Sequence, residues 1–375
     1  MLLGAVKESL DYENRSPLTA ECVTKYVSLG IDVTIESQLG HGSNILDEEL
    51  VIAGAKVLAR EDILRTADVI IGVRKPDQDK LDLMKSNCLH ISFLDPFNEP
   101  DLIKNLAERQ IRSISLEFIP RITRAQKMDA LSSQANLGGY CAVITAAANL
   151  PMALPMMMTA AGTITPSKVF IIGVGVAGLQ AIATAKRLGG RVEAFDTRPA
   201  VEEQVNSLGA KFIKIDIGET GQTKDGYAKP LTDEQIEMQR EGQKKVLSHS
   251  NIVITTAQVF GRKAPVLITK DMIAVMKPGS VIVDMAVETG GNVEGSTLNQ
   301  EIEINGVRII GEGNLPGKVG IHASQVLANN IYNLVAEFWD KDQAELILNN
   351  EDEIIKGCLI TDQGNIVNEK LSFIK

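Results

Sequence analysis

Cysteine and histidine are scarce in this sequence, with four of each among 375 residues. The cysteines stand far apart, no two of them form a CxxC pair, and no histidine lies at ligand spacing from one. A disulfide framework and a zinc site are therefore not expected, and this cysteine usage favours a reducing cytoplasm. The first ten residues, MLLGAVKESL, carry a lysine and a glutamate by the eighth position, so they do not resemble a secretory signal.

Basic residues are outnumbered by acidic ones, 38 to 48, which gives a formal net charge of −10. This balance argues against a nucleic-acid partner and against binding to an anionic membrane surface. The hydrophobic share of 44% and the charged share of 23% are those of an ordinary soluble globular protein. The length predicts two domains, because one core seldom serves so long a chain.

Charge is missing altogether between Ala130 and Ser167. The length of this run would allow a membrane span. It contains Pro151 and Pro155, however, and its apolar residues are mostly alanine and methionine. We therefore expect a helix buried between domains followed by a kinked connector, in preference to a transmembrane helix.

Two series of alternating strand and helix patterns are present. Helical patterns at 18–30 and 99–110 separate the strands of the first series, which predicts a parallel sheet. The segment 324–340 is helical but comes too late for the second sheet, so we expect it to return to the first domain. The predicted fold is α/β, with two doubly wound, Rossmann-like parallel-sheet domains and a cleft between them, comprising 1–132 plus 317–375 and 133–316. The predicted strands are 2–8, 32–37, 68–74, 88–94 and 111–117 in the first series, and 168–172, 191–196, 211–216, 251–257, 280–286 and 307–312 in the second.

A glycine pattern opens the second series. Gly173, Gly175 and Gly178 form a GxGxxG between an apolar strand and an alanine-rich helix, and Asp196 ends the next strand. Such glycines allow a tight turn, close approach of a pyrophosphate and helix packing, while the acid accepts the ribose hydroxyls of the adenosine. NAD(H) is favoured over NADP(H), although Arg198 could accommodate a 2′-phosphate. A purely structural glycine turn with a capping aspartate does not account for the spacing.

A second polar group is concentrated in RITRAQKMDALSSQ, residues 121–134. Its arginines, glutamines, aspartate and serines are the donors and acceptors needed to hold a carboxamide and a ribose. The alternative is an ordinary helix N-cap with a solvated first turn.

Four stretches resemble the NAD(H)-binding domain of the proton-translocating NAD(P) transhydrogenase alpha subunit: 120–140, 155–163, 173–189 and 277–292. The resemblance covers essentially the whole chain, and it extends more distantly to alanine dehydrogenase, which is similar in fold.

This resemblance implies NAD(H) as the cofactor, with Arg121 and Asp129 orienting the nicotinamide through its carboxamide, helped by Ser132. Gln126 would contact the nicotinamide ribose and face the second nucleotide, and these four are the candidate catalytic residues. The remaining implied contacts to the cofactor are Lys127, Met128, Gly173, Val174, Gly175, Val176, Gly178, Asp196, Thr197, Arg198, Gly226, Tyr227, Gln239 and Gln258.

Alanine dehydrogenase is the rival enzyme, since Arg15 and Lys75 match places where it holds its substrate carboxylate. That reaction needs a general acid or base, usually a histidine, and the matching position here reads Asp95. His90 lies on an apolar strand and is expected to be a core residue, and Glu288 stands where that enzyme has aspartate. Hydride transfer between two nicotinamides moves no proton and requires only close, oriented rings.

The resemblance also implies partners: a membrane-spanning transhydrogenase subunit and an NADP(H)-binding domain, with NADP(H) bound there and not on this chain. The chain would then be a cytoplasmic, homodimeric subunit attached to a bacterial inner membrane through its partners. A non-catalytic NAD-binding redox sensor stays open as an alternative.

Overall fold

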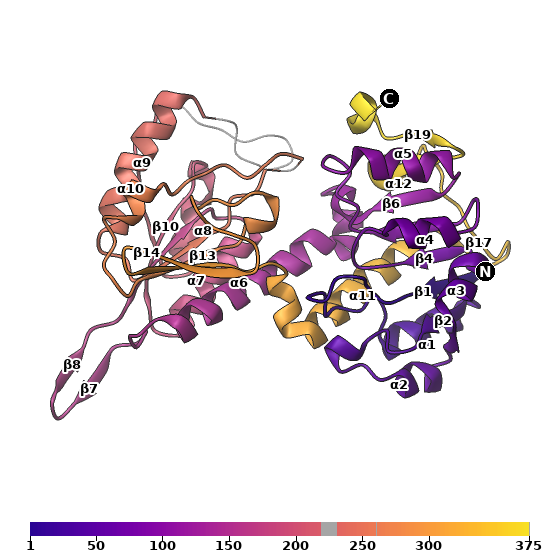
Figure 1. Cartoon of the computed structure of the whole chain (residues 1–375), viewed down its shortest axis with the longest axis horizontal. Coiled ribbons are helices and arrows are strands. Elements are labelled where there is room, and N and C mark those ends of the chain that lie inside the picture. The colour runs from indigo at the N-terminus through magenta and orange to yellow at the C-terminus, as the bar shows by residue number, and fades with distance from the viewer. Residues whose placement is uncertain (219–230, 260, 375) are drawn as a thin grey trace. The chain divides into compact units, whose positions relative to one another are not determined.

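A computed structural model describes residues 1–218, 231–259 and 261–374. The chain forms two compact units, one of residues 1–134 with 316–375 and one of residues 135–315 (Figure 1). Each unit contains its own sheet.

The first unit has an eight-stranded sheet in the order β19-β18-β6-β5-β4-β1-β2-β3. Short runs of branched apolar residues, such as Val-Ile-Ile at 69–71, form its fully buried central strands. Pairing is parallel from β3 to β6 and antiparallel at β18 and β19. The strands are β1 (Leu2–Ala5), β2 (Asp32–Glu36), β3 (Lys56–Leu58), β4 (Val69–Ile71), β5 (Leu89–Ser92), β6 (Arg112–Ser115), β18 (Leu359–Asp362) and β19 (Asn365–Ile366).

Helices connect these strands. α1 begins after Thr19, whose hydroxyl accepts the amide N–H of Cys22, and it ends before Gly30, whose φ is positive. The α-helices of this unit are α1 (Ala20–Ser28), α2 (Asp47–Ile52), α3 (Arg60–Thr66), α4 (Gln78–Leu83), α5 (Pro100–Glu108), α11 (Gly320–Glu337) and α12 (Glu353–Cys358). Its 3-10 turns are η1 (His41–Ser43), η2 (Leu116–Phe118), η3 (Thr123–Met128) and η7 (Glu369–Ile374), and a small hairpin pairs β16 (Trp339–Asp340) with β17 (Glu345–Leu346).

The return of the late helical segment to the first unit is confirmed. α11 packs against α1, η1 and η3, and β18 then joins the sheet beside β6 (Figure 1). The helix begins at Gly320, four residues before the predicted start, and ends at Glu337.

The second unit has a seven-stranded sheet in the order β11-β10-β9-β12-β13-β15-β14, antiparallel only between β14 and β15. Its strands are β9 (Lys168–Ile172), β10 (Arg191–Phe195), β11 (Lys211–Phe212), β12 (Ile252–Thr255), β13 (Val281–Asp284), β14 (Gln300–Ile304) and β15 (Val307–Gly311). Its helices are α7 (Val176–Arg187), α8 (Glu202–Ser207), α9 (Asp233–Leu247) and α10 (Lys270–Ile273), with turns η4 (Pro199–Val201) and η5 (Val287–Thr289), and η6 (Leu315–Val319) follows.

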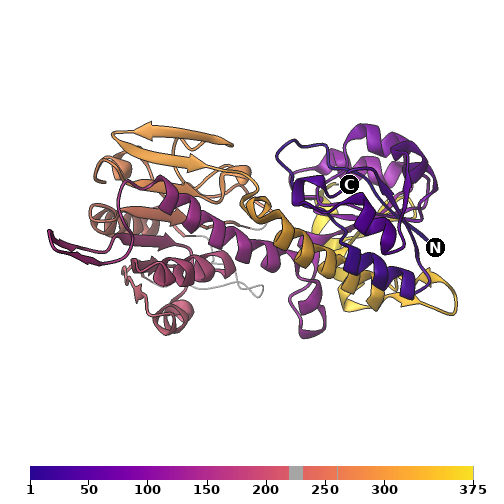
Figure 2. The same ribbon diagram turned by 90° about the horizontal axis from the view of Figure 1, so that it is seen from below.

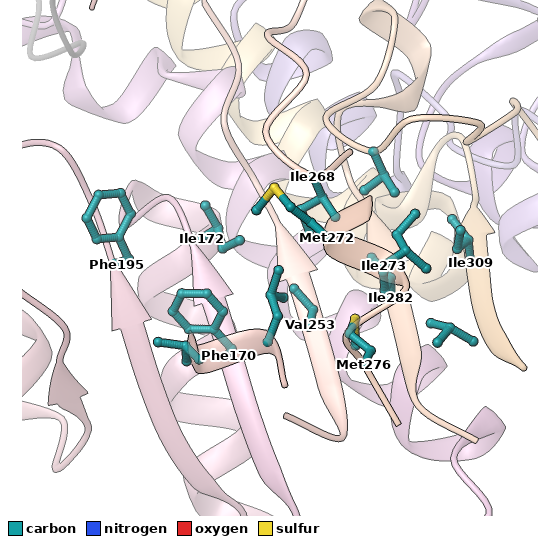
Figure 3. Close-up of a cluster of buried hydrophobic side chains, with 14 residues drawn as sticks. Phe170, Ile172, Phe195, Val253, Ile268, Met272, Ile273, Met276, Ile282 and Ile309 are labelled. Atoms are coloured by element: carbon teal, nitrogen blue, oxygen red, sulfur yellow. The ribbon is translucent and has the colours of Figure 1, made fainter. Parts of the chain in front are cut away.

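The core of this second unit covers one face of the sheet. Figure 3 shows Phe170, Val253 and Ile282 on neighbouring strands, packed against Met272 and Met276 of the α10 region. All five side chains are buried, so the sheet and α10 are joined by apolar contact.

The uncharged stretch contains α6 (Ala130–Asn149) and, after two prolines, a hairpin. The expected kinked connector is thus partly wrong, because β7 (Met157–Thr159) pairs antiparallel with β8 (Gly162–Ile164). The hairpin projects from the second unit in both views (Figures 1 and 2). Within the described ranges, no helix is long and apolar enough to cross a membrane.

The doubly wound α/β fold is confirmed, but a purely parallel pairing is not. Each sheet is mixed, because β14 and β18 arrive through short connections that reverse the chain. The pattern analysis missed β3, β14, β18 and β19, and it made the strand at 211–216 too long, since β11 ends at Phe212. These are short strands at or near the sheet edges, where the sequence carries little strand pattern.

Candidate functional site

The glycine turn lies between β9 and α7 in the second unit. Gly173 has φ +96°, and a Cβ there would meet the Thr256 hydroxyl at 2.6 Å. A Cβ on Gly178 would lie 2.0 Å from the carbonyl oxygen of Gly173. Both positions therefore require glycine, one for its backbone angle and both for close packing.

Gly175 differs from its two neighbours because a Cβ there would meet nothing within 4 Å. Gly175 is also the N-cap of the twelve-residue helix α7, and no side chain caps that helix. The first N–H groups of α7 and the open side of Gly175 together suit a phosphate group. Val174 is buried beneath the turn, whereas Val176 is exposed at the helix start.

Asp196 closes this turn from the end of β10. One of its oxygens, Oδ2, accepts the amide N–H of Val174 at 2.7 Å. Arg198 donates its amide and its Nε to Oδ1, each at 2.8 Å, and its Nη2 to Oδ2 at 2.7 Å. Hydrogen bonding to Asp196 raises the pKa of Arg198. The acid and the base that the sequence analysis weighed separately are thus one ion pair, and Thr197 lies half-buried between them.

The other implied contacts of the second unit are less uniform. Gln258 follows β12, is exposed, and donates to the Met285 carbonyl at 3.3 Å. Gln239 is buried in α9, and its Oε1 has no hydrogen-bond partner among the described residues. Gly226 and Tyr227 lie outside the described residues.

The polar segment of the first unit forms η3 and the start of α6. Asp129 accepts the Ser132 amide at 2.9 Å and the Ser132 hydroxyl at 2.6 Å, which is the geometry of a helix N-cap. Arg121 and Gln126 are exposed, and the Gln126 carboxamide makes no hydrogen bond to another described residue. The Met128 side chain is buried in the unit, so only its main chain is available to a ligand.

This segment is held by residues from the end of the chain. Arg124 pairs with Asp352 at 2.5 Å and Lys127 with Glu337 at 2.8 Å. Asn330 also donates to the Lys127 carbonyl at 2.9 Å. Sequence reasoning missed these anchors, because nothing local relates α11 or α12 to residues two hundred positions earlier.

Arg15 and Lys75, the two residues matched to a substrate carboxylate, lie in different settings. Arg15 is buried and binds Glu13 through Nε at 2.8 Å and Nη2 at 2.7 Å. Arg74, which the sequence analysis did not single out, also donates to Glu13, at 2.7 Å. Lys75 instead pairs with Glu99 in a half-exposed position.

Glu13 is fully buried between these arginines. Burial by itself would raise its pKa, but the hydrogen bonds and charges of Arg15 and Arg74 outweigh burial and hold the pKa at about 2. The two guanidinium groups are thus already paired with a carboxylate of the chain.

His90 is a core residue, as predicted. It is buried on β5, with Nε2 2.9 Å from the Ser92 hydroxyl, and burial lowers its pKa to about 3. Asp95 follows β5 with φ +51° and accepts a hydrogen bond from Asn98 at 2.8 Å. Glu288 is exposed in η5.

Comparison with known proteins places these features in a family. Residues 4–138 match the alanine dehydrogenase/PNT N-terminal domain, and residues 142–369 match the corresponding C-terminal domain. The chain belongs to the alanine dehydrogenase/PNT family.

Among its relatives is the first of the separately encoded pieces of the NAD(P) transhydrogenase alpha subunit of Rhodospirillum rubrum, 43% identical over 380 residues and 99% of both chains. A solved transhydrogenase structure from Sinorhizobium meliloti is 44% identical, with a TM-score of 0.88 over 98% of this chain and 100% of that one. An L-alanine dehydrogenase structure is 25% identical, with a TM-score of 0.83 over 100% and 99%. The resemblance to transhydrogenase alpha subunits is confirmed, and by this homology the chain is an enzyme component.

Proposed function

We propose that this chain is the NAD(H)-binding component of a proton-translocating NAD(P) transhydrogenase. It passes a hydride directly between NADH and NADP⁺ held on a partner domain, and the transfer is coupled to proton movement across a membrane. The observation that carries this proposal is the full-length similarity to transhydrogenase alpha subunits, joined to a glycine turn whose open position, Gly175, lies beside a strand-end carboxylate.

The second unit supplies the adenosine half of the proposed site. The open side of Gly175 and the N–H groups of α7 take the pyrophosphate. Asp196 accepts the ribose hydroxyls, for which Arg198 has to give up part of its pairing, and the negative charge disfavours a 2′-phosphate. Calorimetry on the isolated chain should show tighter binding of NADH than of NADPH, and equal affinities would remove this cofactor assignment.

Arg121, Asp129, Ser132 and Gln126 take the nicotinamide end in this proposal. When bound, NADH supplies the hydride, and the chain needs only to hold the ring in position. The Asp129 and Ser132 cap fixes the loop, while Gln126 is exposed and has its carboxamide available. A site that moves no proton has no need of a titratable group, and Asp95 in place of a histidine fits that requirement.

The decisive experiment is hydride transfer from NADH to an NADP analogue after addition of a purified NADP-binding partner. Transfer in the mixture and none with either protein alone is expected. Binding of NADH without any transfer would favour the redox-sensor alternative. Robust NAD-dependent formation of pyruvate from alanine, at roughly 1–1000 per second, would favour the amino-acid enzyme.

Gln126→Asn isolates the proposed positioning role. Shortening this side chain should slow the transfer step about 10- to 100-fold with little change in NADH affinity. Gln363→Asn is the matched control, because Gln363 is exposed in the turn between β18 and β19 with φ +47°, which asparagine tolerates. Unchanged transfer in Gln126→Asn, with normal complex formation, would remove this residue from the site.

A membrane-spanning subunit and an NADP(H)-binding domain are the other proposed partners, and the chain itself is proposed to form a homodimer. The hairpin supports self-association, because Met158 is 80% exposed and Met156 is 61% exposed on a projecting, uncharged element. Light scattering across micromolar concentrations should give a dimer, and Met156→Ser with Met158→Ser should weaken it. A monomeric wild-type chain would contradict this part of the proposal.

A further inference from the structure

The carboxyl edge of the second sheet has two halves, divided between β9 and β12 where the strand order reverses. A dinucleotide lies across this division, with one mononucleotide on each side. Asp196 marks the β10 side as the adenosine half. The β12 and β13 side is therefore the nicotinamide half, and of the second unit's residues implied by the resemblance only Gln258 belongs to it.

Asn292 clamps the segment that follows β12. This residue is fully buried, and its carboxamide bonds both polar atoms of one residue, Ala257. Oδ1 accepts the Ala257 amide at 3.1 Å, and Nδ2 donates to the Ala257 carbonyl at 2.8 Å and to the Pro265 carbonyl at 2.8 Å. The side chain thus replaces the main-chain partner that Ala257 lacks beyond the end of the strand.

Asp284, the last residue of β13, fixes the clamp in turn. It is fully buried and accepts the amides of Asn292 at 2.9 Å and Val293 at 3.1 Å. Its other oxygen accepts the Ala286 amide at 3.0 Å. The carboxylate therefore ties the loop after β13 to the strand end, and Asn292 transmits that position to β12.

Thr256 completes the connection to the glycine turn. Its hydroxyl donates to the Gly173 carbonyl at 2.9 Å, and Gly173 leaves no room for a Cβ against it. Residues 256–258 are thus held between the glycine turn on one side and Asn292 on the other, and Gln258 is the exposed residue at the end of this segment.

We propose that Asn292 is a positioning residue for the nicotinamide half of the cofactor, acting through Ala257 and Gln258. The proposal rests on the proposed function and deepens it. Its consequence is that the clamp controls binding of the nicotinamide mononucleotide and leaves the adenosine half, held by the glycine turn and Asp196, largely unaffected.

ADP-ribose separates the two halves, because it keeps the adenosine, pyrophosphate and one further ribose but lacks the nicotinamide. Calorimetry on the full chain should show that Asn292→Ser weakens NADH binding about tenfold while ADP-ribose binding stays within about twofold, since a displaced positioning contact acts only on the group it orients. Equal weakening of both ligands, or no change in either, would overturn the proposal.

Asn251→Ser is the matched control. Asn251 lies at the amino end of the same strand, β12, where its Oδ1 accepts the Lys168 amide at 2.9 Å. It makes a comparable side-chain bond to the main chain, but at the opposite edge of the sheet. This variant should lower the melting temperature without changing the ratio of NADH to ADP-ribose affinity, and a changed ratio would overturn the proposal.

A second variant keeps the test valid if Asn292→Ser does not fold. Gln258→Ala alters an exposed side chain and leaves the clamp intact, and it should cause the same selective loss of NADH affinity. Wild-type affinities for both ligands in Gln258→Ala would overturn the inference. A wild-type chain that binds neither ligand would instead refute the proposed function itself.

Discussion

The two units share a strand order but use the carboxyl edges of their sheets differently. In each, a carboxylate at the end of the second strand accepts the amide N–H of the second residue after the first strand. In the first unit Glu36 accepts from Lys7 at 2.8 Å, and in the second Asp196 accepts from Val174 at 2.7 Å. Each carboxylate is also paired with an arginine, Arg60 or Arg198. The shared geometry therefore belongs to the strand order and does not by itself make a cofactor site.

The difference lies in the turn that follows the first strand. After β9 a three-glycine turn leads directly into α7 and leaves Gly175 open. After β1 the long segment 6–19 instead carries charged side chains back onto the sheet edge. Glu8 accepts the Val73 amide at 2.6 Å, and Glu13 binds Arg15 and Arg74.

A cavity of about 600 Å³ remains at this edge of the first unit. Its lining carries both signs of charge, with Lys7 and Arg60 facing Glu8 and Asp77. Side chains that pair with one another thus occupy the edge that in the second unit is left to backbone and space.

The largest expected difference between the units is in acid. Burial, and then the charge of Lys80, lowers the pKa of His90 from 6.5 to about 3. The stability that the neutral histidine contributes is fully present above pH 6.5 and is lost as pH falls towards 3, about 5 kcal/mol by linkage. Thermal unfolding of His90→Gln, which keeps a donor for Ser92, should lose less stability over this range than the wild type.

His249→Gln in the second unit is the control, because that histidine is half-exposed beside Glu193. It should leave the acid profile unchanged. Identical pH profiles for His90→Gln and the wild type would show that His90 does not set the acid limit.

Glu13→Gln is expected to cost about 3 kcal/mol at neutral pH, because it leaves Arg15 and Arg74 without their buried carboxylate. The depressed pKa of Glu13 means that its contribution is present above pH 4.5 and lost as pH falls towards 2. Urea unfolding measures the loss. Glu99→Gln removes the half-exposed partner of Lys75 and should cost at most about 1 kcal/mol. Similar losses for both variants would contradict the buried role of Glu13.

The glycine turn is tested by two substitutions of the same size. Gly178→Ala places a methyl group against the Gly173 carbonyl and should cost about 2 kcal/mol of stability. Gly175→Ala has room and an ordinary φ of −86°, so its stability should change by less than about 0.5 kcal/mol, while NADH affinity falls about tenfold. Normal NADH affinity in Gly175→Ala would mean that this space is not the pyrophosphate site.

The smallest effect is expected for the two equivalent carboxylates. Asp196→Ala and Glu36→Ala should each lose about 1 kcal/mol of stability, since each frees a main-chain N–H. Only Asp196→Ala should also weaken NADH binding, by about 1–3 kcal/mol for two ribose hydroxyls. Equal effects of both variants on NADH affinity would end the distinction between the two edges.

Much of the fold could be read from the residues because its signals are local. The runs at 69–71 and 281–284 are short, branched and apolar, and the turn at 173–178 is restricted by the absence of Cβ atoms. The edge strands β14, β18 and β19 could not be predicted. Their pairing depends on which strand lies beside them and not on a pattern of their own.

By itself, the sequence determined the glycine turn, the strand-end position of Asp196, the polar segment at 121–132 and the late helix of the first unit, since each depends on residues a few positions apart. Only the tertiary structure decided that Asp196 is shared with Arg198 and the Val174 amide, that Glu13 joins Arg15 to Arg74, and that Asn292 clamps Ala257. These partners are two to sixty-one positions apart, and a side chain's donors and acceptors carry no mark of which distant group will satisfy them. Folding chooses the partner, because a buried polar group must find one wherever the packed chain brings it.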